Sequence, residues 1–167
     1  MFPDDLIRQA EGLLAAMRSK KLLVATAESC TGGLIAGLLT EIPGSSDVVD
    51  RGFVTYSNDA KTEMIGVRVE LIADHGAVSR EVALAMAEGA LVHSSADVSV
   101  AVTGVAGPGG GTDAKPVGLV HIAAGRIGAE PIHMECRFGP LSRSEIRLKT
   151  VAAALDLATR AMELAPE

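Results

Sequence analysis

The stretch KLLVATAESCTGGLIAGLLTEI (residues 21–42) predicts a β-strand, a polar turn and an α-helix in direct succession. Its first seven residues, 21–27, form an apolar run of the length of a buried strand. Residues 34–42 continue as an apolar helix, which Pro43 and Gly44 end. Between the two lies ESCTGG, which places a carboxylate, two candidate nucleophiles and a pair of glycines where the strand stops. This arrangement indicates either a polar helix cap or a site where a bond is broken.

The rest of the chain alternates between helical and strand patterns. Such alternation is typical of an α/β layer structure, in which ligands bind to the loops that follow the strands. We therefore expect one domain over residues 1–167, a three-layer α/β/α structure with a central mixed sheet. The other predicted elements are helices at 4–19, 67–73, 80–93 (capped by Ser79) and from Ser142 to Met162, and strands at 47–57, 97–104, 117–125 and 131–138.

The composition limits the classes of function. The chain is 48% hydrophobic but only 2% aromatic, so small aliphatic side chains have to fill its core. A net charge of −6 without a run of Lys or Arg argues against a nucleic-acid partner. The two cysteines, Cys30 and Cys136, show no disulfide or metal-ligand pattern.

No stretch approaches a membrane span and no signal-peptide pattern is seen, so we expect a cytoplasmic domain without a membrane partner. Its small-residue surface favours a homo-oligomer, with a dimer as the simplest form.

Ser29 is the first candidate nucleophile. A residue between a strand end and a helix start can direct its hydroxyl at a ligand, while the backbone N–H groups of Thr31, Gly32 and Gly33 stabilise a developing oxyanion. The simpler interpretation is that Ser29 or Thr31 only caps the helix, and caps are commoner than nucleophiles. Cys30 is a rival nucleophile, but no histidine lies in a comparable loop to activate it, and a small buried filler is the alternative.

Lys61 is the candidate base. The segment YSNDAKTEMIG (56–66) follows a predicted strand; we expect Asn58 or Asp59 to cap a turn that directs Lys61 back toward the strand ends. A lysine desolvated near a hydroxyl loses its proton and serves as a general base. Taken alone, such a lysine is more often a solvated surface residue. The four histidines offer no partner for a Ser-His-Asp triad, because they lie within predicted strands or near helix ends.

The glycine-dense segment TGVAGPGGGTDAKPVG (103–118) is the third candidate. It matches neither the phosphate-binding pattern that ends in Gly-Lys-Ser/Thr nor the G-x-G-x-x-G pattern of dinucleotide sites. It is either a flexible hairpin connection or a substrate-binding loop. The side chain of Lys115, within this segment, either contacts a phosphate or is only solvated by water.

Taken together, five motifs resemble the C-terminal domain family of the competence/damage-inducible protein CinA. They are AESCTGG (27–33), PGSS (43–46), VTYSNDAK (54–61), GAVS (76–79) and the segment of residues 103–118, and they occur in the family's order. The resemblance covers essentially residues 5–160. It implies hydrolysis of the carboxamide of nicotinamide mononucleotide to nicotinic acid mononucleotide and ammonia, without a metal or cofactor. It also leaves a non-catalytic pyridine-nucleotide-binding module as the alternative, and an interaction protein for DNA uptake or repair as a third, which the charge disfavours.

The resemblance implies roles for individual residues. Ser29 matches the nucleophile and Lys61 its base, with Tyr56 in the same site. A departure lies at GPLSRSEIR (139–147), where the family usually has Gly-Asp-Arg followed by a second arginine; Ser142 replaces the aspartate. The residues implied to bind substrate are Thr31, Gly32, Gly33, Thr103, Gly104, Ala106, Gly107, Gly109 and, as a contact for phosphate, Arg143.

Overall fold

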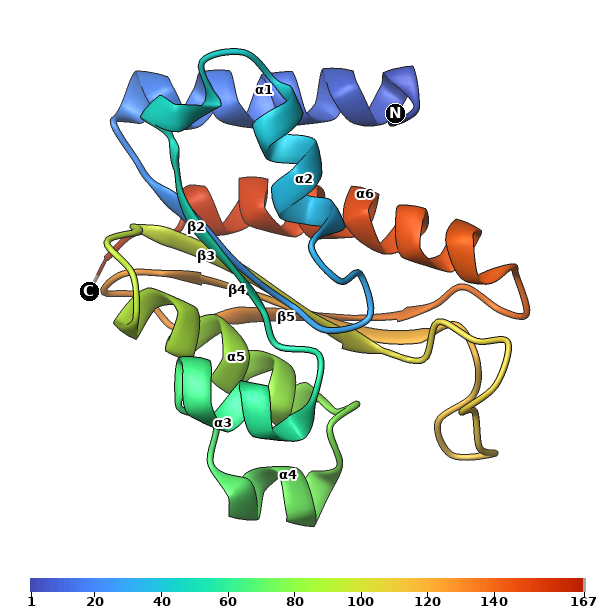
Figure 1. Ribbon diagram of the computed structural model, residues 1–167. Coiled ribbons are helices and arrows are strands. Elements are labelled where there is room, and N and C mark those ends of the chain that lie inside the picture. Colours follow the sequence, from blue (N-terminus) through green and yellow to red (C-terminus); the bar gives the residue numbers. More distant parts are fainter. Residues whose placement is uncertain (167) are drawn as a thin grey trace.

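A five-stranded mixed sheet forms the centre of the computed structural model, which describes residues 1–166 (Figure 1). Its spatial order is β2-β1-β3-β4-β5, with β1 parallel to both β2 and β3 and with antiparallel pairs β3–β4 and β4–β5. The strands are β1 (Val24–Glu28), β2 (Val49–Val54), β3 (Val98–Gly104), β4 (Leu119–Arg126) and β5 (Ile132–Arg137).

Helices cover both faces of this sheet. Figure 1 shows α1 (Asp4–Lys20), α2 (Leu34–Glu41) and α6 (Arg143–Met162) on one face, and α3 (Asn58–Ile65), α4 (Val69–His75) and α5 (Arg80–Val92) on the other. A short 3-10 turn, Ser45–Asp47, precedes β2. The three-layer α/β/α fold with a mixed sheet is therefore confirmed.

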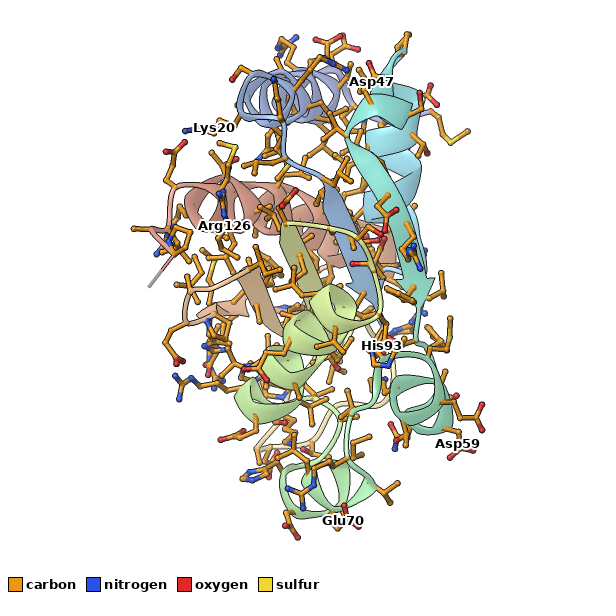
Figure 2. All side chains as sticks on the ribbon, turned by 90° about the vertical axis from the view of Figure 1, so that its left-hand side faces the viewer. Lys20, Asp47, Asp59, Glu70, His93 and Arg126 are labelled. Atoms are coloured by element: carbon orange, nitrogen blue, oxygen red, sulfur yellow. The ribbon has the colours of Figure 1, made fainter. Side chains whose placement is uncertain are left out.

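The burial of the strands follows from this double cover. All residues of β1 are buried, and so are all but the last residue of β3 and of β4, whereas β2 and β5 at the sheet edges are half-buried or exposed. Strands that are covered on both faces need apolar residues at successive positions, which explains their Val- and Ala-rich sequences. Two hydrophobic clusters result, one on each side of the sheet, and Figure 2 shows side chains filling both layers.

The small residues of α5 allow this helix to lie close to its neighbours. A Cβ atom on Gly89 would lie only 2.0 Å from the carbonyl oxygen of Ile65, at the end of α3. Glycine is therefore required where the two helices meet. Ala83, Ala87 and Ala90 of α5 are fully buried, which fits the low aromatic content of the chain.

Most of the helix caps predicted from the sequence are present in the structure. The hydroxyl oxygen of Ser79 accepts from the N–H of Val82 and caps α5, as predicted. Ser142 and Glu145 form a reciprocal capping box at the start of α6, so the serine at this position caps the helix. The prediction for residues 56–66 was wrong in its details: a full helix, α3, follows β2, and its cap is Ser57 rather than Asn58 or Asp59.

Candidate active site

The reversal of strand order places a crevice at the carboxyl end of β1. The chain leaves β1 to form β2 on one side and later β3 on the other, and open α/β sheets bind ligands at such a point. Figure 1 shows the β1–α2 connection, the long loop after β3 and the start of α6 at this same end of the sheet. Ser29 follows β1 directly, and Tyr56 lies two residues beyond β2.

Ser29 and Lys61 are in direct contact. The Nζ atom of Lys61 lies 3.1 Å from Oγ of Ser29 and also lies 3.0 Å from the carbonyl oxygen of Thr55 and 3.3 Å from that of Tyr56. Because Ser57 caps α3, Lys61 sits one turn into the helix and its side chain returns to the end of β2. It is only 1% exposed, so the alternative of a solvated surface lysine is wrong.

The surroundings of Lys61 favour a neutral amine. Burial lowers the pKa of Lys61 below its usual value of 10.5, with a smaller opposing effect from Cys30. A neutral amine has two N–H donors for the carbonyls of Thr55 and Tyr56 and one lone pair, which is then available to the Ser29 hydroxyl. The geometry therefore suits a serine whose proton is taken by a lysine.

Glu28, the last residue of β1, caps α2 from outside the helix. Its carboxylate is fully buried and accepts from the backbone N–H groups of Gly33, Ile35 and Ala36 and from the hydroxyl of Thr31, at 2.5–3.2 Å. The positive end of a helix stabilises such a charge. Neither Ser29 nor Thr31 is the cap, and this role of Glu28 was not predicted from the sequence. A carboxylate immediately before the turn was the available signal.

The turn between β1 and α2, residues 29–33, is hereafter the nucleophile turn. The N–H of Gly32 donates to the carbonyl oxygen of Ser29 at 3.0 Å, and that of Gly33 donates to Glu28. These two N–H groups therefore bind acceptors within the protein, whereas the sequence predicted that they would bind an oxyanion. In the described part of the chain, no other residue accepts from the N–H groups of Cys30 and Thr31, and both residues are buried.

Cys30 fits the alternative of a buried filler. It is 5% exposed, and burial raises the pKa of its thiol to about 12, with Glu28 adding to the rise and Arg147 opposing it. A thiol with such a pKa is almost entirely protonated at neutral pH and is a poor nucleophile. Among the described residues, no histidine is hydrogen-bonded to Ser29.

Tyr56 and Arg143 form a second contact beside the dyad. Tyr56 is 59% exposed and its hydroxyl accepts from Nη2 of Arg143 at 3.1 Å, while its backbone carbonyl accepts from Lys61. Nη1 of Arg143 donates to the carbonyl of Gly107 at 2.8 Å. Arg143 therefore links the end of β2 to the loop after β3.

The loop of residues 105–118, here the glycine loop, is tied down at several points. Thr103, in β3 just before this loop, is buried, and its hydroxyl donates to the carbonyl of Ala77 at 2.8 Å. Lys115 donates to the carbonyl of His75 at 2.7 Å, so it meets backbone rather than only water. A Cβ on Gly104 would lie 2.7 Å from the side chain of Val120, which explains glycine there by packing. Ala106 is buried, and Gly109 has open space around it.

Arg147 reaches the nucleophile turn from α6. Its Nε donates to the carbonyl of Cys30 at 3.2 Å and its Nη2 to that of Thr31 at 3.0 Å. Arg147 lies in the segment 139–147 that departs from the family pattern, and its contact with the turn was not predicted from the sequence.

No metal site is visible within the described residues: no group of three or more His, Cys, Asp or Glu side chains is arranged to hold an ion. Likewise, none of the helices over residues 1–166 combines the length and apolar character that crossing a bilayer requires.

Comparison with known proteins places the chain in a class of proteins described as competence/damage-inducible. The family described as the CinA C-terminal domain matches residues 7–162, so the chain belongs to this family. It is 50% identical over 151 residues to a CinA-like protein of Colwellia psychrerythraea, covering 90% of this chain but 34% of the relative. The chain therefore spans about a third of the length of that relative.

Other relatives match over nearly their whole length. The chain is 46% identical over 156 residues to the nicotinamide-nucleotide amidohydrolase PncC of Escherichia coli, with 93% of each chain covered. A solved structure of the competence/damage inducible protein CihA from Agrobacterium tumefaciens is 54% identical, with a TM-score of 0.96 over 98% of this chain and 99% of that one. The fold and the family inferred from the motifs are thus confirmed.

Proposed function

We propose that the chain hydrolyses the carboxamide of nicotinamide mononucleotide by a serine–lysine mechanism, giving nicotinic acid mononucleotide and ammonia. The observation that carries this proposal is the 3.1 Å contact between Ser29 Oγ and the buried amine of Lys61. The likeness to PncC over nearly the whole of both chains supplies the class of substrate. The reaction recovers pyridine nucleotides for reuse.

In the first half of the reaction, the neutral amine of Lys61 takes the proton of the Ser29 hydroxyl as Oγ bonds to the amide carbon. The carbonyl oxygen becomes an oxyanion, which hydrogen-bond donors beside Ser29 stabilise. The positive pyridinium ring withdraws electrons and makes the amide carbon easier to attack. When the C–N bond breaks, the Lys61 ammonium returns its proton to the nitrogen and ammonia leaves.

In the second half, water attacks the ester formed on Ser29. Lys61 takes a proton from that water, the bond between the acyl carbon and Ser29 Oγ breaks, and the serine oxygen regains a proton from Lys61. The product acid leaves with both oxygen atoms, one of them from water. Lys61 thus returns to its neutral state after each cycle, which its dry surroundings favour.

Binding of the nucleotide is assigned to the loops around the dyad. Arg143, an exposed cation beside Tyr56, is proposed to contact the phosphate, and the open space at Gly109 leaves room for substrate. Packing and internal hydrogen bonds already engage several of the proposed binding residues, which then act by shaping the loops. The proposed set remains Thr31, Gly32, Gly33, Thr103, Gly104, Ala106, Gly107, Gly109 and Arg143.

The test is to incubate the purified protein with nicotinamide mononucleotide and to measure ammonia and nicotinic acid mononucleotide together. Equal amounts of both are expected, and Ser29→Ala should abolish their release while Ser19→Ala, at an exposed serine of α1, should not. Binding of the nucleotide without release of ammonia would instead favour the non-catalytic module. A cytoplasmic location and a dimer stay predictions, the latter to be tested by light scattering in solution.

A further inference from the structure

The amine of Lys61 is held by neutral acceptors alone. Its three partners are Ser29 Oγ and the carbonyls of Thr55 and Tyr56, at 3.0–3.3 Å. Over residues 1–166, no carboxylate lies within 4.0 Å of this amine. Because no ion pair fixes the amine, its position depends on the backbone that carries it, which is the short helix α3.

Few contacts hold α3 in place. Of its eight residues only Lys61 and Ile65 are buried, and their spacing of four puts them on one face. Ile65, at the carboxyl end of the helix, lies against Gly89 of α5, which runs beside α3 in Figure 1. A helix of this length is not stable by itself in water. Its first turn, which carries Lys61, therefore needs a contact of its own.

Ser57 supplies that contact. Its backbone is extended, its Oγ atom accepts from the N–H of Ala60 at 3.0 Å, and its carbonyl accepts from the N–H of Lys61 at 3.2 Å. On the other side of Ser57, the N–H of Thr55 donates to the carbonyl of Glu28 at 2.9 Å and extends the pairing of β2 with β1. Ser57 thus joins the segment that supplies the acceptor carbonyls to the turn that supplies the amine.

Loss of the cap would change the surroundings of the amine. Without the Ser57 hydroxyl, the first turn of α3 opens more often, and water then reaches the Lys61 side chain. Burial lowers the pKa of this amine below 10.5, and among the described titratable groups only Cys30 adds a further effect, which raises it. Hydration would therefore return the pKa of Lys61 toward its usual value, and a protonated amine cannot accept the proton of Ser29.

We propose, resting on the function proposed above, that Ser57 is a positioning residue for the amidase reaction. Its cap keeps the first turn of α3 closed, so that the amine of Lys61 stays dry and in contact with Ser29 Oγ. Ser57 acts through Lys61 in this role and does not touch the substrate. Removing its cap should therefore lower kcat and leave KM nearly unchanged.

The experiment compares three substitutions that differ in capping strength. Asparagine caps a helix as well as serine does, glycine caps it nearly as well, and alanine does not cap it. Loss of a cap shifts the closing of a first turn roughly 2- to 30-fold, and we expect kcat of Ser57→Ala to fall by about that factor. KM for nicotinamide mononucleotide should change by less than about twofold. Ser57→Asn and Ser57→Gly should keep most of the activity, although neither side chain has a hydroxyl.

Two measurements separate this role from a general loss of stability. The rising part of the pH profile of kcat/KM reports the free base, and in Ser57→Ala it should move up by about half a pH unit or more. An NMR titration of the Lys61 side chain should show the same shift without any turnover. Ser79→Ala is the matched control, because it removes a cap in the same way from α5, a helix that carries none of the residues assigned to the reaction. Its pH profile should not move.

Distinct results overturn distinct proposals. A wild-type protein that releases no ammonia overturns the amidase function and with it this role of Ser57. With an active wild type, equal kcat for Ser57→Ala and Ser57→Asn overturns the role of Ser57 alone. So does a rise in KM at constant kcat, which makes Ser57 a substrate contact, and so does a pH profile that stays in place in Ser57→Ala or moves as far in Ser79→Ala.

A Ser57→Ala protein that does not fold leaves the decision to Ser57→Gly. Glycine is a weaker cap than asparagine, so the rising part of its pH profile should lie at higher pH than that of Ser57→Asn. An equal or lower position overturns the proposal.

Discussion

Replacing Glu28 with glutamine tests how the nucleophile turn is held. The two side chains have nearly the same shape, so the change removes the charge and exchanges one acceptor oxygen for an NH2 donor without creating a cavity. In the protein, Oε2 accepts from Thr31 Oγ1 and from the N–H groups of Gly33 and Ile35, and Oε1 accepts from the N–H of Ala36. The glutamine oxygen can occupy only one of these two positions.

The expected loss follows from this count. With the amide oxygen at the busier Oε2 position, its NH2 group faces the N–H of Ala36, and a buried donor left without an acceptor costs about 1–3 kcal/mol. The remaining bonds lose charge assistance, and the negative charge at the start of α2 disappears, which costs about 0.3–1 kcal/mol more. We expect a total of about 3 kcal/mol, which for a domain of this size lowers Tm by roughly 6–12 °C.

Thermal unfolding followed by circular dichroism, with urea unfolding at 25 °C, measures this loss. Glu11→Gln, at an exposed glutamate of α1, is the matched control and should change Tm by less than about 1 °C. We also expect a lower kcat for Glu28→Gln, because the turn that carries Ser29 loosens. A Glu28→Gln protein as stable as the control would refute the capping role of this carboxylate.

Three further predictions concern the dyad and a histidine pair. Ser29→Ala and Lys61→Ala should each lower turnover about a thousandfold or more, and the double variant should lose little more, because the two groups act as a unit. Cys30→Ala should keep most of its activity. If Cys30→Ala were inactive and Ser29→Ala active, the thiol would be the nucleophile. Because burial lowers the pKa of Lys61, kcat/KM should rise with pH and level off below pH 10.5, and a flat or falling profile would contradict a neutral lysine base. His121 Nδ1 and His133 Nε2 lie 2.9 Å apart, and burial lowers both pKa values, with the charge of His121 also acting on His133. The unfolded chain therefore binds more protons below about pH 6.5, so Tm should fall from pH 7.5 to pH 5.5, and His133→Gln should reduce that fall.

Most elements of the fold were predictable from local pattern. The helix at the N-terminus, the strand pair near the C-terminus and the helix from Ser142 appear within a few residues of their expected bounds, because apolar period and caps are local signals. The element that was missed as a helix, α3, has a weak pattern: of its eight residues, only Lys61 and Ile65 are buried. Lysine is a charged residue type, so its burial cannot be read from the sequence. The period of apolar residues therefore does not reveal the buried face of α3.

The candidate active site likewise contains residues that local motifs predict and residues whose roles depend on tertiary contacts. Ser29 and Lys61 could be named from their motifs, and the resemblance to the CinA C-terminal domain family paired them. The roles of Glu28 and Arg147 could not be read from spacing, since they depend on which backbone groups come within hydrogen-bond distance. Glu28 binds groups up to eight residues away, but Arg147 binds carbonyls 116 and 117 residues away.

The sequence by itself determined the layered α/β class, the placement of polar residues after the strands and the family. Those features depend on period, capping and motif order, all of which are properties of neighbouring residues. Tertiary structure alone decided which N–H and carbonyl groups of the nucleophile turn bind Glu28 and Arg147. It also decided that Lys61 is buried, which lowers the pKa of its amine, and that Arg147 of α6 binds carbonyls of the turn. These depend on packing between segments far apart in the chain, where burial sets the pKa of an amine and a hydrogen bond is made or lost over less than an ångström.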